Sequence, residues 1–188
     1  MTSTELILLP LTAITASAAL IDVRTRHIPN WLVLLGFTVG SIAHLATSIS
    51  VDCATGSPLG RAVGSAGLSW FLGTLICAIV PVFMFQMGAM GGGDVKLLAV
   101  VGASLGPRLG IQVELFAFVL AALCAPIQLA WQGQLPGLLG NTAILITNPF
   151  LPKSRRRPMP GSRLTSLPFG PSIFLGTLLV AVAQRWHP

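Results

Sequence analysis

The stretch AVGSAGLSWFLGTLICAIVPVFMFQMGAMGGG at residues 62–93 holds 32 residues without one charged side chain. A helix needs about 20 apolar residues to cross the hydrocarbon core of a bilayer, so this stretch is long enough for one long or tilted crossing. Three glycines end the stretch, and Asp94 follows them directly. We therefore predict a transmembrane helix here, with an acidic side chain just beyond its end.

Composition extends this prediction to the whole chain. Of its 188 residues, 53% are hydrophobic and 9% are charged, whereas about 25% of residues are charged in soluble domains. Other uncharged stretches cover residues 6–21, 31–51, 115–152 and 164–184, and residues 95–106 form a short one that needs a thinned bilayer or shielding neighbours to cross. We expect an all-α polytopic transmembrane bundle of about six helices, forming a single domain over residues 1–188.

Positive charges predict how the bundle is oriented, because Lys and Arg are retained preferentially in cytoplasmic loops. An N-terminus outside the cell places eight of the eleven basic residues inside: Arg24, Arg26, Lys96, Lys153, Arg155, Arg156, Arg157 and Arg163. The same orientation puts Asp22 and Asp94 on the cytoplasmic side, and a basic, proline-rich cytoplasmic loop at about residues 148–167. This bias also accounts for the net charge of +6, so we expect no nucleic-acid partner.

Two aspartates at the ends of apolar stretches suggest a chemistry. Hydrolysis of a peptide bond needs a water that is made nucleophilic and a proton for the leaving nitrogen, and two carboxyl groups that share one proton supply both. This chemistry needs no metal and no cofactor. The three cysteines form no CxxC pair and no second ligand stands at metal spacing from any histidine, so we expect no metal site.

Each aspartate also has a structural interpretation. Asp22, followed by Arg24 and Arg26, is equally compatible with a solvated helix end. The glycines before Asp94 allow another chain to approach closely, but they are also typical of a helix break or of close helix packing. Neither motif decides the function alone.

Three separated segments together resemble the type IV prepilin peptidases, the bacterial branch of the GxGD aspartic proteases. The segments are IDVRTRHIPN at residues 21–30, GGGDVKLL at 91–98 and LPFGPSIFLG at 167–176. The resemblance implies that Asp22 and Asp94 are the catalytic pair and that Gly91 and Gly93 shape the backbone around the second. It leaves Arg24 and Lys96 as possible substrate-binding or charge-positioning residues, or as cytoplasmic anchors. The residues that shape helix starts are then Pro29, Asn30, Pro168, Gly170 and Pro171.

The resemblance also implies a substrate and a location. The substrate is the precursor of a pilin or pseudopilin, whose short basic leader stays in the cytoplasm while its apolar helix lies in the membrane. The location is the bacterial cytoplasmic membrane, with the catalytic residues near its cytoplasmic face. Larger family members add an N-terminal segment with paired cysteines that accompanies N-methylation. This chain shows no such segment, so we expect peptidase activity without methyltransferase activity.

Two other functions remain open at this stage. A proton-coupled transporter also places carboxyl groups in a membrane, although the sequence shows no inverted repeat and both aspartates lie at span ends instead of the midplane. A protease-derived assembly factor that binds pilin helices without cutting them is the second alternative. The sequence leaves the oligomeric state open.

Overall fold

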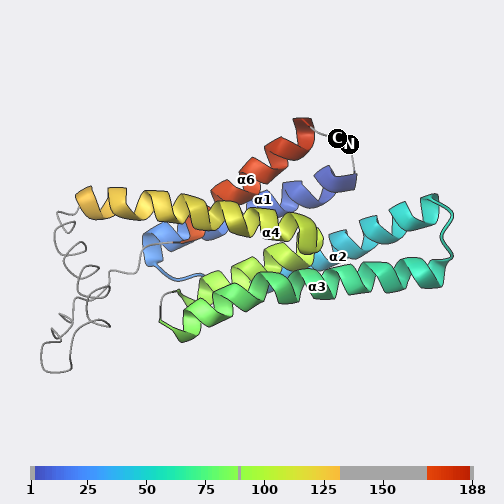
Figure 1. Cartoon of the computed structure of the whole chain (residues 1–188), viewed down its shortest axis with the longest axis horizontal. Helices are drawn as coiled ribbons and strands as arrows, with labels where there is room; N and C mark the ends of the chain where they lie inside the picture. The colour runs from blue at the N-terminus through green and yellow to red at the C-terminus, as the bar shows by residue number, and fades with distance from the viewer. Residues whose placement is uncertain (1–2, 89, 132–168, 187–188) are drawn as a thin grey trace, which may run out of the picture. The chain divides into compact units, whose positions relative to one another are not determined.

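A computed structural model describes residues 3–88, 90–131 and 169–186. Over these residues it contains five helices and no strand (Figure 1). The helices are α1 (Ser3–Thr25), α2 (Asn30–Ala54), α3 (Leu59–Gln86), α4 (Gly92–Trp131) and α6 (Gly170–Trp186). The predicted basic loop at 148–167 and Pro168 lie outside the described residues.

By length and composition, four of the five helices qualify as candidate membrane spans, over residues 6–25, 30–54, 59–86 and 92–124, the last of which contains the break at Gly106. Helix α6 has 17 residues and is shorter than the others. The all-α membrane bundle is therefore confirmed. The number of about six helices and the outward N-terminus stay predictions.

The chain divides into two compact units, Met1–Leu120 with Pro168–Pro188, and Ala121–Leu167. The second contains, among described residues, only the last part of α4. In the first, which we call unit 1, α1 packs against both α6 and α2, and α2 packs against α3. The prediction of a single domain stays untested.

The connection between α1 and α2 is short because both helix ends are sharply defined. Arg26 adopts φ 52°, a left-handed conformation that ends a helix, and its N–H donates to the Asp22 carbonyl at 2.8 Å. Pro29 then takes an extended conformation as the N-cap of α2, with φ −70° and ψ 139°. Its carbonyl accepts from the N–H of Leu32 at 3.1 Å. The chain thus turns back within a few residues of Asp22.

Helix α4 folds back on itself at Gly106. This glycine has φ 72° and ψ −178°, and the next residue, Pro107, has no N–H to continue the helix. A Cβ built on Gly110 would lie 3.2 Å from the Cα of Gly102, although eight residues of straight helix span about 12 Å. The first limb, residues 92–105, is therefore about 21 Å long, too short to cross a bilayer as the sequence suggested.

Glycine residues let α3 contact both limbs of α4. A Cβ on Gly73 would lie 2.8 Å from the Cα of Gly106, and one on Gly110 would lie 2.7 Å from the Sγ of Cys77. Real Cβ atoms do not approach other atoms so closely. Small residues allow such contacts between helices in membranes, where packing replaces the hydrophobic effect as the driving force.

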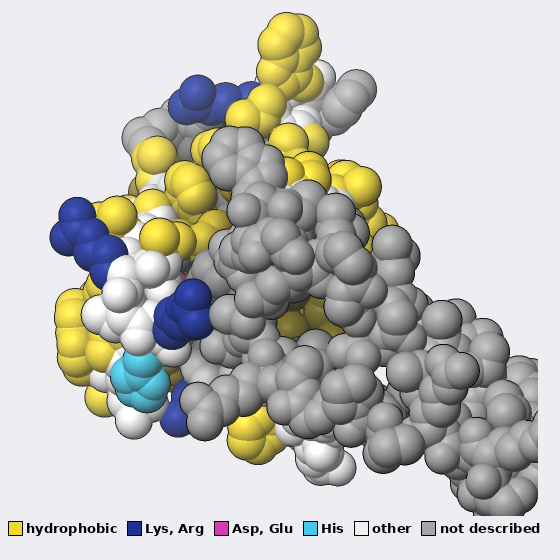
Figure 2. All heavy atoms as spheres, turned by 90° about the vertical axis from the view of Figure 1, so that its left-hand side faces the viewer, with side chains coloured by type: hydrophobic (Ala, Val, Ile, Leu, Met, Phe, Trp, Pro, Cys, Tyr) yellow, Lys and Arg dark blue, Asp and Glu magenta, His cyan; other side chains and the backbone are white. Residues whose placement is uncertain are grey.

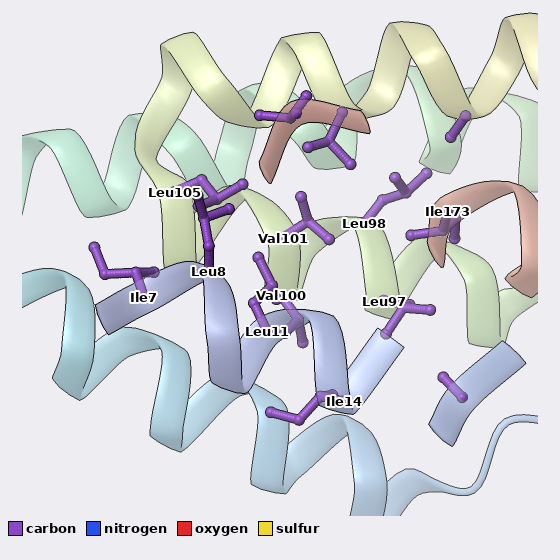
Figure 3. Packing of buried hydrophobic residues seen from close by; sticks show 14 of the residues in the cluster. Ile7, Leu8, Leu11, Ile14, Leu97, Leu98, Val100, Val101, Leu105 and Ile173 are labelled. Atoms are coloured by element: carbon purple, nitrogen blue, oxygen red, sulfur yellow. The ribbon is translucent and has the colours of Figure 1, made fainter. Parts of the chain in front are cut away.

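The core of unit 1 joins α1, the first limb of α4 and α6. Figure 3 shows the labelled side chains of α1 and of α4 pointing toward one another, with Ile173 of α6 beside them. Leu11 is 1% exposed, and Leu97, Leu98 and Ile173 are fully buried. The core holds in place the start of α4, which carries Asp94. Large apolar side chains on the outer faces of α2 and α3 remain exposed, as expected of helices that contact lipid.

Candidate active site

Asp22 lies in the last turns of α1 and is buried, with 6% of its surface exposed. Its Oδ2 accepts a hydrogen bond of 2.9 Å from the backbone N–H of Gly170, at the start of α6. Gly170 has no side chain to keep the two apart: a Cβ there would lie 2.9 Å from Oδ2 and 3.3 Å from the Cα of Ala19. The third motif of the sequence therefore contacts the first aspartate directly.

Asp94 lies in the first turn of α4. Its N–H donates to the carbonyl of Gly91 at 3.1 Å, and this bond starts the helix. Its Oδ1 is buried and has no hydrogen-bond partner among the described residues. A Cβ on Gly91 would lie 3.0 Å from Oδ2, so a side chain there would crowd the carboxyl group. The free oxygen can therefore bind a water or a polar group of another molecule.

Two contacts hold the start of α2 against the start of α4. A Cβ on Gly93 would lie 3.1 Å from the Cβ of Ile28, so the glycine lets the two segments touch. The Nζ of Lys96 donates to the Oδ1 of Asn30 at 2.9 Å. As a result, Asp22 near the end of α1 and Asp94 at the start of α4 lie close enough for the charge of Asp22 to act on the carboxyl group of Asp94. Figure 1 shows the end of α1 and the start of α4 on the same side of the cartoon.

The remaining predicted residues take different positions. Arg24 is exposed in the last turn of α1. Pro29 and Asn30 form the start of α2, and Pro171 lies in the first turn of α6. The carbonyl of Phe169 accepts from the N–H groups of Ser172 and Ile173 at 3.0 and 3.3 Å, which makes Phe169 the residue from which α6 starts.

Figure 2 looks onto the end of the molecule at the left of Figure 1. Lysine, arginine and histidine side chains stand out among the coloured residues, and almost no acidic surface is visible. The basic residues near these helix ends include Arg24, Arg26 and Lys96, and all three are exposed. Asp22 is buried and Asp94 is half-buried, whereas these basic residues close to them in sequence are exposed.

Glu114 is a buried acidic residue that the sequence pattern did not single out. The uncharged stretch begins after it, at Leu115, but the structure places Glu114 inside the second limb of α4, 7% exposed. Its carboxyl group bonds to the thiol of the fully buried Cys77, and its Oε1 has no partner among described residues. The signal was available, since an isolated acid in an apolar helix is a functional candidate.

His44 is buried in α2, and only one of its two ring nitrogens has a partner among the described residues. Its Nδ1 lies 3.1 Å from the carbonyl of Ser104, just before the break in α4. Its Nε2 is buried without a partner in the described part of the chain. In that same part, no group of three or more His, Cys, Asp or Glu side chains is arranged to hold a metal ion.

The chain was compared with models of known protein families. The model of the type IV leader peptidase family matches residues 8–126, well over half of the chain. The chain belongs to the type IV leader peptidase family. A search of curated proteins and a search of solved structures each found no match.

Membership in the type IV leader peptidase family makes this chain a leader-peptidase-like protease, and its apolar helices make it a multi-pass membrane protein. The matched residues include both aspartates and the break in α4. Helix α6 lies beyond the match, so its contact with Asp22 is known only from the structure. In this leader peptidase, a helix outside the matched residues therefore contacts the carboxyl group of Asp22.

Proposed function

We propose that the chain is an aspartic endopeptidase that removes the short basic leader from type IV prepilins or pseudopilins. The observation that carries the proposal is the pairing of Asp22 and Asp94. They come from different helices, 72 positions apart in sequence, and lie close enough for the charge of Asp22 to act on the carboxyl group of Asp94. Family membership supports a peptidase at this position.

The pair can do all the acid–base chemistry that peptide hydrolysis requires. Two neighbouring carboxyl groups do not both ionise at low cost, so one holds a proton while the other acts as a base. The base takes a proton from water as the water attacks the peptide carbonyl, and the acid gives its proton to the leaving nitrogen. The unpartnered Oδ1 of Asp94 offers a hydrogen-bonding position for such a water or peptide group.

The glycines around Asp94 support access by an extended chain. Gly91 is exposed, and Gly93 lies against Ile28 with no side chain between them. A side chain at position 91 would crowd the Asp94 carboxyl group, whereas one at position 93 would meet Ile28. We propose that the scissile segment of the substrate lies along Gly91 in an extended conformation, where a side chain would block it.

The distribution of basic residues supports a location for the reaction. Arg24 and Lys96 lie near the aspartates and are exposed, and Lys and Arg concentrate on the cytoplasmic side of membrane proteins. We therefore propose that cleavage occurs at the cytoplasmic face of the bacterial inner membrane, where the basic leader meets the apolar helix of the precursor. A leader that stays in the cytoplasm would reach the aspartates there.

The test is processing of prepilins from the same genome by the purified protein in lipid vesicles. We expect Asp22→Asn and Asp94→Asn each to lower the cleavage rate by about 100-fold or more. Asp52→Asn is the matched control, because Asp52 lies at the far end of α2, bonded to Ser65. Full activity in either active-site variant would exclude the two-aspartate mechanism. Failure of the unaltered protein to cleave any prepilin would favour a role in assembly.

A further inference from the structure

We infer that the start of α6 gives the two aspartates different roles. Asp22 is the ionised group that activates water, and Asp94 is the protonated group that gives its proton to the leaving nitrogen. This inference rests on the proposed function, because it divides the two-aspartate mechanism between its two members. The residue that makes the division is Gly170, acting on Asp22 as a positioning residue.

The contact at Asp22 favours a negative charge there. A backbone N–H can only donate, and the N–H of Gly170 points at Oδ2 from 2.9 Å inside the protein. The next residue, Pro171, has no N–H, and the N–H of Ser172 is bound to the carbonyl of Phe169. The N–H of Gly170 is therefore the first amide of a 17-residue helix, and its partner is Asp22 instead of a carbonyl group of the helix. The N-terminus of a helix carries a partial positive charge.

The surroundings of Asp94 favour a proton. Its Oδ1 is buried with no donor among the described residues, and a buried anionic oxygen without a donor is unfavourable. Asp94 also lies at a helix start, where the backbone N–H of Gly91 donates to its carboxyl group and the amides of Asp94 and Val95 donate to the Gly91 carbonyl. No donor among the described residues, however, reaches the buried Oδ1. The neighbouring charge of Asp22 acts on the same carboxyl group, and like charges side by side do not both ionise.

The reaction then balances without another reagent. Asp22 takes one proton from water as the oxygen of that water bonds to the peptide carbonyl carbon. The carbon–nitrogen bond breaks as Asp94 transfers its proton to the nitrogen. The products are a carboxylic acid and an amine, while Asp22 now holds the proton and Asp94 the charge. Transfer of that proton from Asp22 to Asp94 restores the starting state.

The sharpest test replaces Gly170 with glycolic acid, which turns the backbone amide into an ester. The change removes the N–H and adds no side chain. The base must be ionised to work, so loss of its donor makes it hold a proton up to a higher pH. We expect the acidic limb of the kcat/KM profile against pH to move up by about one pH unit. The alkaline limb should stay in place.

The same ester at Leu178 is the control. Leu178 lies in the middle of α6, so the change removes one helix amide at a distance from Asp22. We expect no shift of either limb there. An unmoved acidic limb in the position-170 ester, or a shift of the alkaline limb instead, would overturn the inference. The proposed function would survive that outcome as long as Asp22→Asn and Asp94→Asn still abolish cleavage.

Infrared spectroscopy decides the matter even if the ester protein does not fold. A protonated carboxyl group has a carbonyl stretching band that a carboxylate lacks. In a Glu114→Gln background, which removes the other buried acid, we expect Asp94→Asn to lose this band at neutral pH and Asp22→Asn to keep it. Loss in Asp22→Asn with retention in Asp94→Asn would reverse the two roles and contradict the inference.

Discussion

The backbone N–H of Gly170 donates to the carboxylate of Asp22 across 148 positions of sequence. This buried bond connects the last described helix to the first. The two residues approach so closely because position 170 has no side chain. The contact makes α6 part of the candidate active site, although the helix supplies no titratable group to it.

Gly170→Ala tests this contact by adding a methyl group that would clash with Asp22. An added methyl group would lie 2.9 Å from Oδ2 of Asp22 and 3.3 Å from the Cα of Ala19, which is part of the backbone. We expect the carboxyl group to move and cleavage to fall by about tenfold or more, because small misplacement of catalytic groups is costly. The measurement is the rate of leader removal in vesicles.

Gly64→Ala is the matched control for that change. Gly64 lies within α3, and nothing stands within 4 Å of a Cβ built there. We expect unchanged cleavage and a slightly higher stability, since alanine favours helix over glycine by up to about 1 kcal/mol. Equal losses in both variants would mean that the effect at Gly170 is not specific to Asp22.

Lys96 and Asn30 should be energetically coupled. Their hydrogen bond of 2.9 Å joins the start of α2 to the helix that carries Asp94. Because the pair is exposed, we expect a coupling free energy of only about 0.5–1 kcal/mol. Thermal unfolding of Lys96→Met, Asn30→Ala and the double variant measures it. Additive losses would show that the two side chains do not interact in the membrane.

Removal of the Cys77 thiol should destabilise the bundle. It is the side-chain partner of the Glu114 carboxyl group inside unit 1, and a buried polar group that loses its partner costs about 1–3 kcal/mol. We expect Cys77→Ala to lower the free energy of unfolding by this amount. Adding Glu114→Met should recover much of the loss, because it removes the stranded polar group. Cys53→Ala, at an exposed cysteine, should change little.

Arg26→Gly should stabilise the protein. Arg26 holds φ 52°, which is unfavourable for a residue with a side chain and natural for glycine. Relief of that strain exceeds the added flexibility of the unfolded chain, for a net gain of about 0.5–1 kcal/mol. Arg24→Gly is the opposite control, because Arg24 is helical and glycine there weakens the helix. A lower melting temperature for Arg26→Gly would contradict this account.

Several features could be predicted because they depend on neighbours in the sequence. The uncharged stretch at residues 31–51 became most of α2, and the one at 62–93 held most of α3. The short stretch at 95–106 ended where α4 breaks, because Gly106 takes a left-handed φ of 72° and Pro107 has no N–H to continue the helix. The role of Asp22 and Asp94 as a catalytic pair stays a prediction.

Other features could not be predicted in the same way. Helix α4 reverses because Gly73, Gly102 and Gly110 let its two limbs and α3 touch, and no local pattern states which glycines will meet. Glu114 was mistaken for a helix boundary because a charge usually marks one. The thiol that partners it comes from another helix, 37 positions away.

The sequence by itself determined that this chain is a membrane-embedded helical protein with two acidic motifs, since hydropathy and helix-breaking residues act over a few neighbouring positions. Only the tertiary structure decided that the N–H of Gly170 reaches Asp22 and that Lys96 reaches Asn30. The physical reason is distance along the chain. Such contacts depend on how closely whole helices approach one another. The distance of approach depends on which positions on several helices carry glycine and which carry a larger side chain.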